Sequence, residues 1–237
     1  MNMNNTTTLP RQLSKVEVMN AFMRSIYNWL AAGIGLTAVI SFILTYTSAR
    51  SLLMTPTGQM IGFGCIIAEL VLVFVLSLRV QKLSAQTATG LFLGYSLLNG
   101  ISLSFVLMMY TPGSVAQAFI GAAGMFAVMS IYGLYTKKDL TSWGSLLFMG
   151  LIGIIIAMIV NIFLGSNALT MAISVIGIII FLGLTAYDTQ LFREMGESIP
   201  HDDATAVRRG AIIGALNLYL NFINIFLMLL RLMGNRE

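Results

Sequence analysis

A carboxylate at the end of a long apolar run is the first residue of this sequence that could do chemistry. No ionisable side chain occurs from Leu169 to Ala186, and the run ends in Ala186-Tyr187-Asp188-Thr189-Gln190. A run of this length is typical of a membrane-spanning helix, and acids within such helices mark ion and proton paths. Asp188 is therefore the leading candidate for a functional residue. The hydroxyl of Tyr187 could support it as a hydrogen-bond donor.

The last apolar stretch, residues 211–230, offers a counterpart to Asp188. Small and polar residues recur along it at steps of three and four, which places them on one side of a helix. They are Gly210, Gly214, Asn217, Asn221, Asn224, Met228 and Arg231. Such a seam packs against other helices and not against lipid. We therefore expect Asp188 to face the asparagine row, with Asn217 and Asn221 at its depth.

Glu69 is the other acid that lies within an apolar stretch. An ionised carboxylate near the middle of a membrane helix costs a few kcal/mol or more, so Glu69 must be protonated, hydrated or paired across helices. Arg79 is about three turns away on the same helix, too far for direct pairing. Two interpretations remain open for Glu69: a place in an ion or proton path, or a structural hydrogen bond made by the protonated acid.

The composition assigns the chain to a class before any motif does. Of 237 residues, 57% are hydrophobic and only 9% are charged, against about a quarter charged in a soluble domain. Seven stretches have the length that crosses a bilayer, and all four prolines fall outside them. The stretches are residues 27–46, 58–78, 87–109, 115–135, 145–164, 169–190 and 211–230. The sequence predicts an all-α membrane protein, a bundle of seven transmembrane helices.

Two regions follow from this division: a polar N-terminal segment, residues 1–26, and a seven-helix transmembrane domain, residues 27–237. Ten basic residues lie on the side of the N-terminus and three on the other. By the positive-inside rule, the N-terminus is cytoplasmic and the C-terminus outside. The segment 1–26 is too polar for the bundle, so we expect it to be exposed, where it could bind a partner.

Residue types and motifs that are rare or absent in the sequence exclude several classes of function. Cys65 is the single cysteine and His201 the single histidine, so no thiolate metal cluster or disulfide is expected within one chain. The sequence has no phosphate-binding glycine loop and no nucleophilic serine motif. An intramembrane aspartyl protease would need a second acid in the last helix, where this chain has none. We expect no enzymatic activity, no resident cofactor and no nucleic-acid partner.

Three pieces of the sequence together resemble the Bax inhibitor-1 family, in its bacterial branch. They are Ala186-Tyr187-Asp188-Thr189-Gln190, the run Leu218-Tyr219-Leu220-Asn221-Phe222-Ile223-Asn224-Ile225-Phe226 with Leu229-Leu230-Arg231, and Lys137-Lys138-Asp139-Leu140. The resemblance extends from Tyr27 onward. It implies seven helices with the seventh at the centre, a bacterial inner membrane, and a pH-sensitive calcium leak.

The resemblance also implies roles for individual residues. In the family, two aspartates share a proton and close the cytoplasmic side of the pore; the first corresponds to Asp188 and the second to Asn221. Asn221 is a departure, since an amide beside a carboxylate cannot repel it as a second carboxylate does. Any pH dependence would then come from Asp188 alone. Glu69 corresponds to the acid of the family's second helix, and Arg79 to the basic residue at that helix's inner end.

Our leading hypothesis is a calcium leak or slow cation pathway, in which Asp188 and Glu69 supply cation-attracting oxygens. Protons would suit the same few acids and amides equally well. A proton-coupled cation exchanger is the second hypothesis. A regulatory protein that binds another membrane protein, such as a quality-control protease, is the third.

Overall fold

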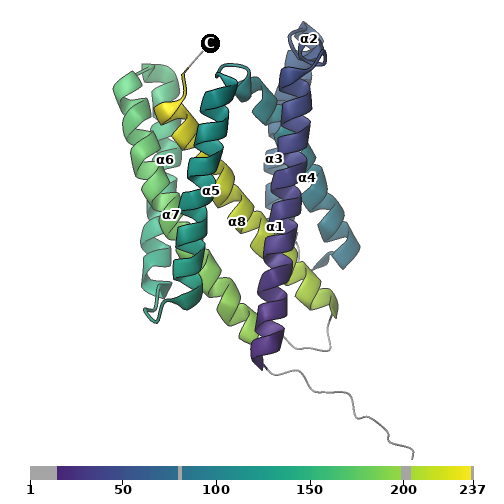
Figure 1. Ribbon diagram of the computed structural model, residues 1–237, viewed down its shortest axis with the longest axis vertical. Coiled ribbons are helices and arrows are strands. Elements are labelled where there is room, and N and C mark those ends of the chain that lie inside the picture. The colour runs from purple at the N-terminus through teal and green to yellow at the C-terminus, as the bar shows by residue number, and fades with distance from the viewer. Residues whose placement is uncertain (1–14, 80–81, 199–203, 236–237) are drawn as a thin grey trace, which may run out of the picture.

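The computed structural model describes residues 15–79, 82–198 and 204–235, and within these residues the chain forms helices and no strand. The helices are α1 (Lys15–Tyr46), α2 (Arg50–Leu53), α3 (Pro56–Arg79), α4 (Ala85–Leu107), α5 (Pro112–Tyr135), α6 (Thr141–Leu164), α7 (Asn167–Ser198) and α8 (Ala204–Met233). Seven of them are long and apolar enough to cross a membrane, and α2 is a single turn between α1 and α3. The predicted seven-helix bundle is confirmed (Figure 1).

The helix ends follow from local sequence signals. Ser84 and Thr111 precede α4 and α5, and their side chains accept hydrogen bonds from the backbone N–H groups of Thr87 and Ser114. Such caps satisfy donors that have no partner inside a helix. Gly165 ends α6 with a φ of 61°, in the left-handed region that glycine enters without steric cost.

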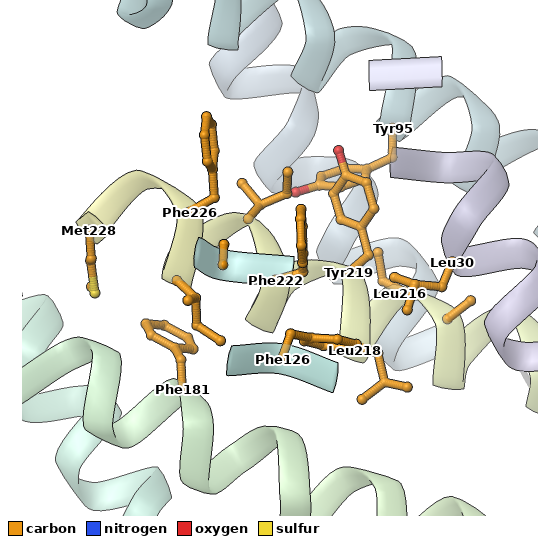
Figure 2. Close-up of a cluster of buried hydrophobic side chains, with 14 of the residues drawn as sticks. Leu30, Tyr95, Phe126, Phe181, Leu216, Leu218, Tyr219, Phe222, Phe226 and Met228 are labelled. Carbon is orange, nitrogen blue, oxygen red and sulfur yellow. The ribbon is translucent and has the colours of Figure 1, made fainter. Parts of the chain in front are cut away.

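The last helix, α8, lies at the centre of the bundle. It packs against α1, α4, α5 and α7, and it crosses the bundle diagonally behind α1 and α5 (Figure 1). Within its most apolar stretch 72% of the residues are buried, compared with 6–39% in the other spans. Large side chains of α8, among them Phe222 and Phe226, fill the core between its neighbours (Figure 2). The expected central position of the seventh span is confirmed.

The boundary predicted at residue 26 does not coincide with a break in the structure. The first helix begins at Lys15 and continues through that position, and Phe22, Met23 and Ile26 are buried. Phe22 packs on Gly196 of α7, and Ile26 packs on Gly214 of α8. These apolar residues recur at helical spacing, so residues 15–26 extend the first span and belong to the bundle. The rest of the predicted segment, residues 1–14, lies outside the described residues.

Two helices are peripheral. Within the described residues, α3 packs mainly on α4 and the short α2, and α6 packs mainly on α7. Their outer faces carry large exposed apolar side chains such as Phe63 and Leu70 on α3 and Ile162 on α6. In a bilayer these faces contact lipid tails, which explains why both helices are apolar nearly all round. Side chains at the interface of α3 with α4 therefore lie close to the lipid and away from the bundle centre.

Candidate functional site at the crossing of the last two helices

Asp188 and Asn221 meet where α7 crosses α8. The Asn221 side-chain amide donates a hydrogen bond of 2.7 Å from Nδ2 to Asp188 Oδ2. Both side chains are buried, with 9% of Asp188 and 5% of Asn221 exposed. The predicted contact between this aspartate and the asparagine row is confirmed for Asn221. A buried charge-assisted bond of this kind ties the two helices together at one point.

The other residues of the predicted seam do not join this contact. Asn224 donates from Nδ2 to the carbonyl oxygen of Leu220, one turn earlier on its own helix. Asn217 is half-buried and has no hydrogen-bond partner among the described residues. Arg231 is exposed, about 15 Å further along α8 than Asn221. The polar site is therefore a single pair and not a row of asparagines.

The hydroxyls that flank Asp188 in the sequence point elsewhere. The ring of Tyr187 packs on Gly144 of α6, where an added Cβ would lie 2.6 Å from Tyr187 Cζ. Thr185 donates to the carbonyl oxygen of Phe181 on its own helix. Thr189 is buried, and its hydroxyl finds no partner in the described part of the chain. The supporting role expected for Tyr187 beside Asp188 is not what the structure shows, because neighbouring residues on a helix face different directions.

Glu69 belongs to a second polar site, between α3 and α4. Its Oε1 accepts a 2.6 Å hydrogen bond from Ser102 Oγ, and its Oε2 accepts one of 3.1 Å from Asn99 Nδ2. Arg79 is exposed at the last position of α3, about 15 Å along the axis, and takes no part. Glu69 is thus hydrogen-bonded to two uncharged side chains of the neighbouring helix and is not paired with a basic side chain.

This second site continues into the core through Tyr219 of α8. The Tyr219 hydroxyl lies 2.9 Å from Asn99 Oδ1 and 2.6 Å from Thr37 Oγ1 of α1. Thr37 Oγ1 in turn lies 2.7 Å from the carbonyl oxygen of Ser96 on α4. Four helices are joined by these bonds. Tyr219 and Asn221 are two positions apart, so they leave α8 on nearly opposite sides.

The two intramembrane acids therefore belong to separate polar sites, and calcium binding at either Asp188 or Glu69 stays a prediction. Among the described residues no group of three or more His, Cys, Asp or Glu side chains gathers to hold a metal ion. One cavity of about 350 Å³ lies between α1, α4, α5 and α8, with Phe119 and Phe226 in its apolar lining. Another lies beside Arg231. Neither cavity is lined by Asp188 or Glu69.

Residues 19–237 match the model of a family described as "Inhibitor of apoptosis-promoting Bax1". The chain belongs to the Bax inhibitor-1 family. It is 48% identical over 219 residues to the inner membrane protein YbhL of Escherichia coli K12, covering 92% of this chain and 93% of YbhL. It is also 40% identical over 227 residues to a protein of Deinococcus radiodurans, covering 95% of each chain. The expected family is thereby shown.

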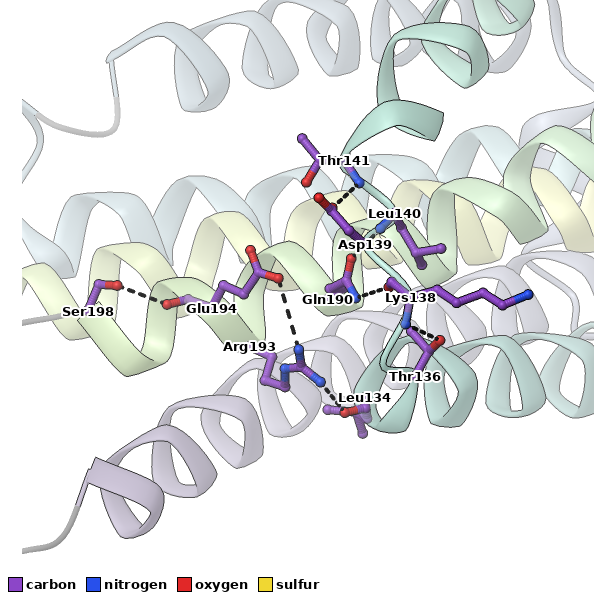
Figure 3. Close-up of polar contacts among 10 residues, drawn as sticks. All are labelled: Leu134, Thr136, Lys138, Asp139, Leu140, Thr141, Gln190, Arg193, Glu194 and Ser198. Atoms are coloured by element: carbon purple, nitrogen blue, oxygen red, sulfur yellow. Dashed lines mark hydrogen bonds and ion pairs between the residues drawn. The ribbon is translucent and has the colours of Figure 1, made fainter.

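In this Bax inhibitor-1 family member, the motif piece that contains Asp188 binds both of the other pieces: Asp188 accepts from Asn221, and Gln190 bonds to the third piece. Gln190, two residues after Asp188, is 4% exposed and reaches the loop between α5 and α6. Its Nε2 donates to the carbonyl oxygen of Lys138 at 2.9 Å, and its Oε1 accepts from the backbone N–H of Leu140 at 2.8 Å (Figure 3). The piece that contains Asp188 therefore also fixes the Lys137-Lys138-Asp139-Leu140 loop.

Further polar contacts secure the same loop. Arg193 Nη1 donates to the carbonyl oxygen of Leu134 at 2.7 Å, and Arg193 lies 4.0 Å from the Glu194 carboxylate (Figure 3). Asp139 accepts from the backbone N–H of Thr141 at 2.8 Å. Hydrogen bonds from the Thr141 side chain and then its backbone hold the pKa of the Asp139 carboxyl below its usual value. The end of α7 is thus anchored to the neighbouring hairpin.

Replacing Gln190 by methionine keeps the length of the side chain and removes both loop hydrogen bonds. The buried N–H of Leu140 then lacks an acceptor, and we expect a loss of stability of about 1–3 kcal/mol. Hydrogen exchange of the peptide covering residues 136–141 should accelerate. Gln117→Met, at an exposed position of α5, is the matched control. Equal exchange in the two variants would contradict this role of Gln190.

Among the site residues that sequence reasoning did not single out are Gln190 and Tyr219. Both carried a usable signal, because a polar group within or beside an apolar span must find a partner. Gln190 is an uncharged polar residue at the end of an apolar run, and Tyr219 is the only tyrosine of the last span. Their partners lie 50 and more positions away in the sequence, so the pattern could not name them.

Proposed function

We propose that this chain is a cation leak pathway of the bacterial inner membrane, with calcium as the main transported ion and Asp188 as its controlling residue. The chain is a multi-pass membrane protein of the Bax inhibitor-1 family, and its relative YbhL is an inner membrane protein. The N-terminus is cytoplasmic in this proposal and the C-terminus is outside. The protein acts as a transport protein and not as an enzyme.

The observation that carries the proposal is the buried bond between Asp188 and Asn221. One carboxylate oxygen accepts from Asn221, and the other has no donor among the described residues. A carboxylate with a free oxygen attracts a hard cation such as calcium, which prefers oxygen ligands. Because the same carboxylate ties α7 to the central helix, a cation that reaches it competes with Asn221.

This competition supplies a gate. While Asn221 holds Asp188, the two helices stay in contact and the pathway is closed. When a cation reaches Asp188, the bond to Asn221 weakens, and α7 is free to shift relative to α8. Asp188 lies about 15 Å before the end of α7 at Ser198, so the gate is on the side of the α7–α8 loop.

Calcium efflux from proteoliposomes tests this function. Asp188→Asn removes the negative charge while it preserves the shape of the side chain, and we expect efflux to fall about tenfold, the effect of roughly 1.4 kcal/mol. The remaining efflux should be nearly independent of pH. Asp139→Asn, at a fully exposed aspartate in the α5–α6 loop, is the matched control and should leave efflux unchanged.

The same measurement separates the competing functions. An exchanger would move calcium only when a pH gradient is imposed, whereas a leak needs only the calcium gradient. If folded native protein carries no more calcium than protein-free liposomes at mildly acidic and mildly alkaline pH, the leak is disproved. The regulatory function, binding to another membrane protein, would then be the one to pursue.

A further inference from the structure

When Glu69 is ionised, the polar site around it has more hydrogen-bond contacts than it has donor protons to place in them. Five close contacts join Ser102 to Glu69, Glu69 to Asn99, Asn99 to Tyr219, Tyr219 to Thr37, and Thr37 to the Ser96 carbonyl. Each hydrogen bond needs one proton between its two heavy atoms. The number of available protons therefore decides which state of Glu69 fits this arrangement.

With Glu69 ionised, four protons serve the five contacts. Ser102 and the Asn99 amide nitrogen donate to the carboxylate, and Tyr219 donates to the Asn99 oxygen. The Thr37 hydroxyl has one proton but faces two oxygens, at 2.6 Å on Tyr219 and 2.7 Å on Ser96. One of these oxygen pairs then has no proton between its atoms, which is repulsive at such a distance.

With Glu69 protonated, every contact is satisfied. Half a turn of the Asn99 amide exchanges its oxygen and nitrogen without moving another atom. The Glu69 hydroxyl then donates to Asn99, the Asn99 nitrogen donates to Tyr219, and Tyr219 donates to Thr37. Thr37 donates to the Ser96 carbonyl, and Ser102 still donates to the second Glu69 oxygen. Five protons now serve five contacts, and the chain runs in one direction from α3 through α4 and α8 to α1.

The surroundings of Glu69 favour the same state. It is the fourteenth residue of the 24-residue helix α3, near the middle of the bilayer, and its helix neighbour Leu70 is 58% exposed to lipid. The titratable groups close enough to act on it are Cys65 on α3, Tyr95 on α4 and Tyr219 on α8. None of them is a cation. The charged residues of α3 and α2, Arg79 and Arg50, lie at the helix ends. An unpaired carboxylate at this depth is costly.

We propose that Glu69 is a proton-binding site that holds the neutral acid at neutral pH, and that its proton completes a directional hydrogen-bond chain to the central helix. When Glu69 loses this proton, the Asn99 amide turns by half a turn, and Tyr219 donates to Asn99 in place of accepting from it. One of the two oxygen pairs at Thr37 is then left without a proton and is repulsive. The hold of α8 on α1 and α4 therefore depends on the proton of Glu69. This site is distinct from Asp188 and makes no use of calcium.

Infrared spectroscopy of the lipid-embedded protein at neutral pH detects this proton directly, since a protonated carboxyl has a carbonyl stretch that an ionised one lacks. We expect the band in the native protein, its loss in Glu69→Gln, and its retention in Asp188→Asn. Tyr219→Phe should shift the band because it removes the next acceptor in the chain. Tyr95→Phe is the matched control, since Tyr95 packs edge-on against Tyr219 with its hydroxyl outside the chain, and it should leave the band in place.

Isotope labelling makes the result independent of any variant. In native protein grown with carboxyl-labelled glutamate the band should move, because Glu69 lies in the middle of its span, whereas Glu17, Glu194 and Glu197 lie in the end turns of α1 and α7. A band that is absent from the native protein, or that does not move with the label, overturns the proposal. This test of the proposal is independent of calcium transport, because no ion flux is measured.

The stability of two variants gives a second readout. A glutamine at position 69 has an acceptor for Ser102 and a donor for Asn99, as the protonated acid does, so Glu69→Gln should keep a melting temperature close to the native one. Glu69→Ala leaves both partners unsatisfied and should lower it. Equal destabilisation by glutamine and alanine would show that the site requires the ionised acid and would overturn the proposal.

Discussion

Gly133→Ala is expected to destabilise the protein by about 1–3 kcal/mol, because α5 and α7 touch at this glycine with no room for a side chain. A Cβ at Gly133 would overlap the carbonyl oxygen of Ala186 and lie 2.9 Å from Thr189 Cβ. One of these neighbours is backbone, so a side-chain rotation cannot relieve the overlap. The helices must separate, and the part of α7 that moves contains Asp188.

Gly124→Ala on the same helix is the control for this prediction. Nothing lies within 4 Å of a Cβ at Gly124, so the added methyl group meets open space. Alanine also favours helix over glycine by about 1 kcal/mol, and this variant should be neutral or slightly more stable. Thermal unfolding in the same detergent compares the two. Equal melting temperatures for the two variants would show that α5 and α7 are not packed this closely.

Part of the fold could be predicted because the membrane leaves few alternatives. Apolar runs of the right length had to be helices, and the polar seam of the last span had to face other helices. Asp188 and Asn221 could be paired for the same reason, since each needed a partner at the same depth. What the seam did not reveal was that Asn224 bonds to its own helix.

The helix ends were harder to predict, because hydropathy marks the membrane and not the helix. The last turns of α7 contain Arg193, Glu194 and Glu197, so the apolar run stops at Gln190 although the helix continues to Ser198. Similarly, α1 begins at Lys15, ahead of the apolar run. Its apolar residues Phe22, Met23 and Ile26 are spaced for one helix face, a pattern that a search for uniform hydropathy overlooks.

The surroundings of Glu69 could not be predicted, because they depend on which helices are neighbours. The sequence gives seven spans but not their arrangement, and Asn99 and Ser102 become partners of Glu69 only because α3 packs on α4. The link through Tyr219 to Thr37 joins residues 182 positions apart. A polar residue in a span predicts that a partner exists without naming it.

Asn221→Asp is expected to give the protein a steep pH response that the native chain lacks. The family resemblance implies a second aspartate at this position, and here the 2.7 Å contact would join two carboxylates. While they share one proton, α7 and α8 stay bound. Once that proton is lost, two like charges about 4 Å apart repel by about 4 kcal/mol at an effective dielectric of 20. The variant should therefore open at alkaline pH, with calcium efflux rising more than tenfold between mildly acidic and mildly alkaline conditions.

Asn217→Asp adds the same acid one turn earlier, at a half-buried position with no bond to Asp188, and serves as the control. Its efflux should not acquire the steep alkaline rise. Spin labels on α7 and α8 provide a readout that does not depend on calcium: their separation should grow with pH in Asn221→Asp and stay constant in Asn217→Asp and the native chain. If both aspartate variants respond alike, the added charge and not its contact with Asp188 causes the change, and the pair does not act as a gate. If the helices separate without calcium efflux, the pair is a pH-sensitive joint and the conducted ion is a different one.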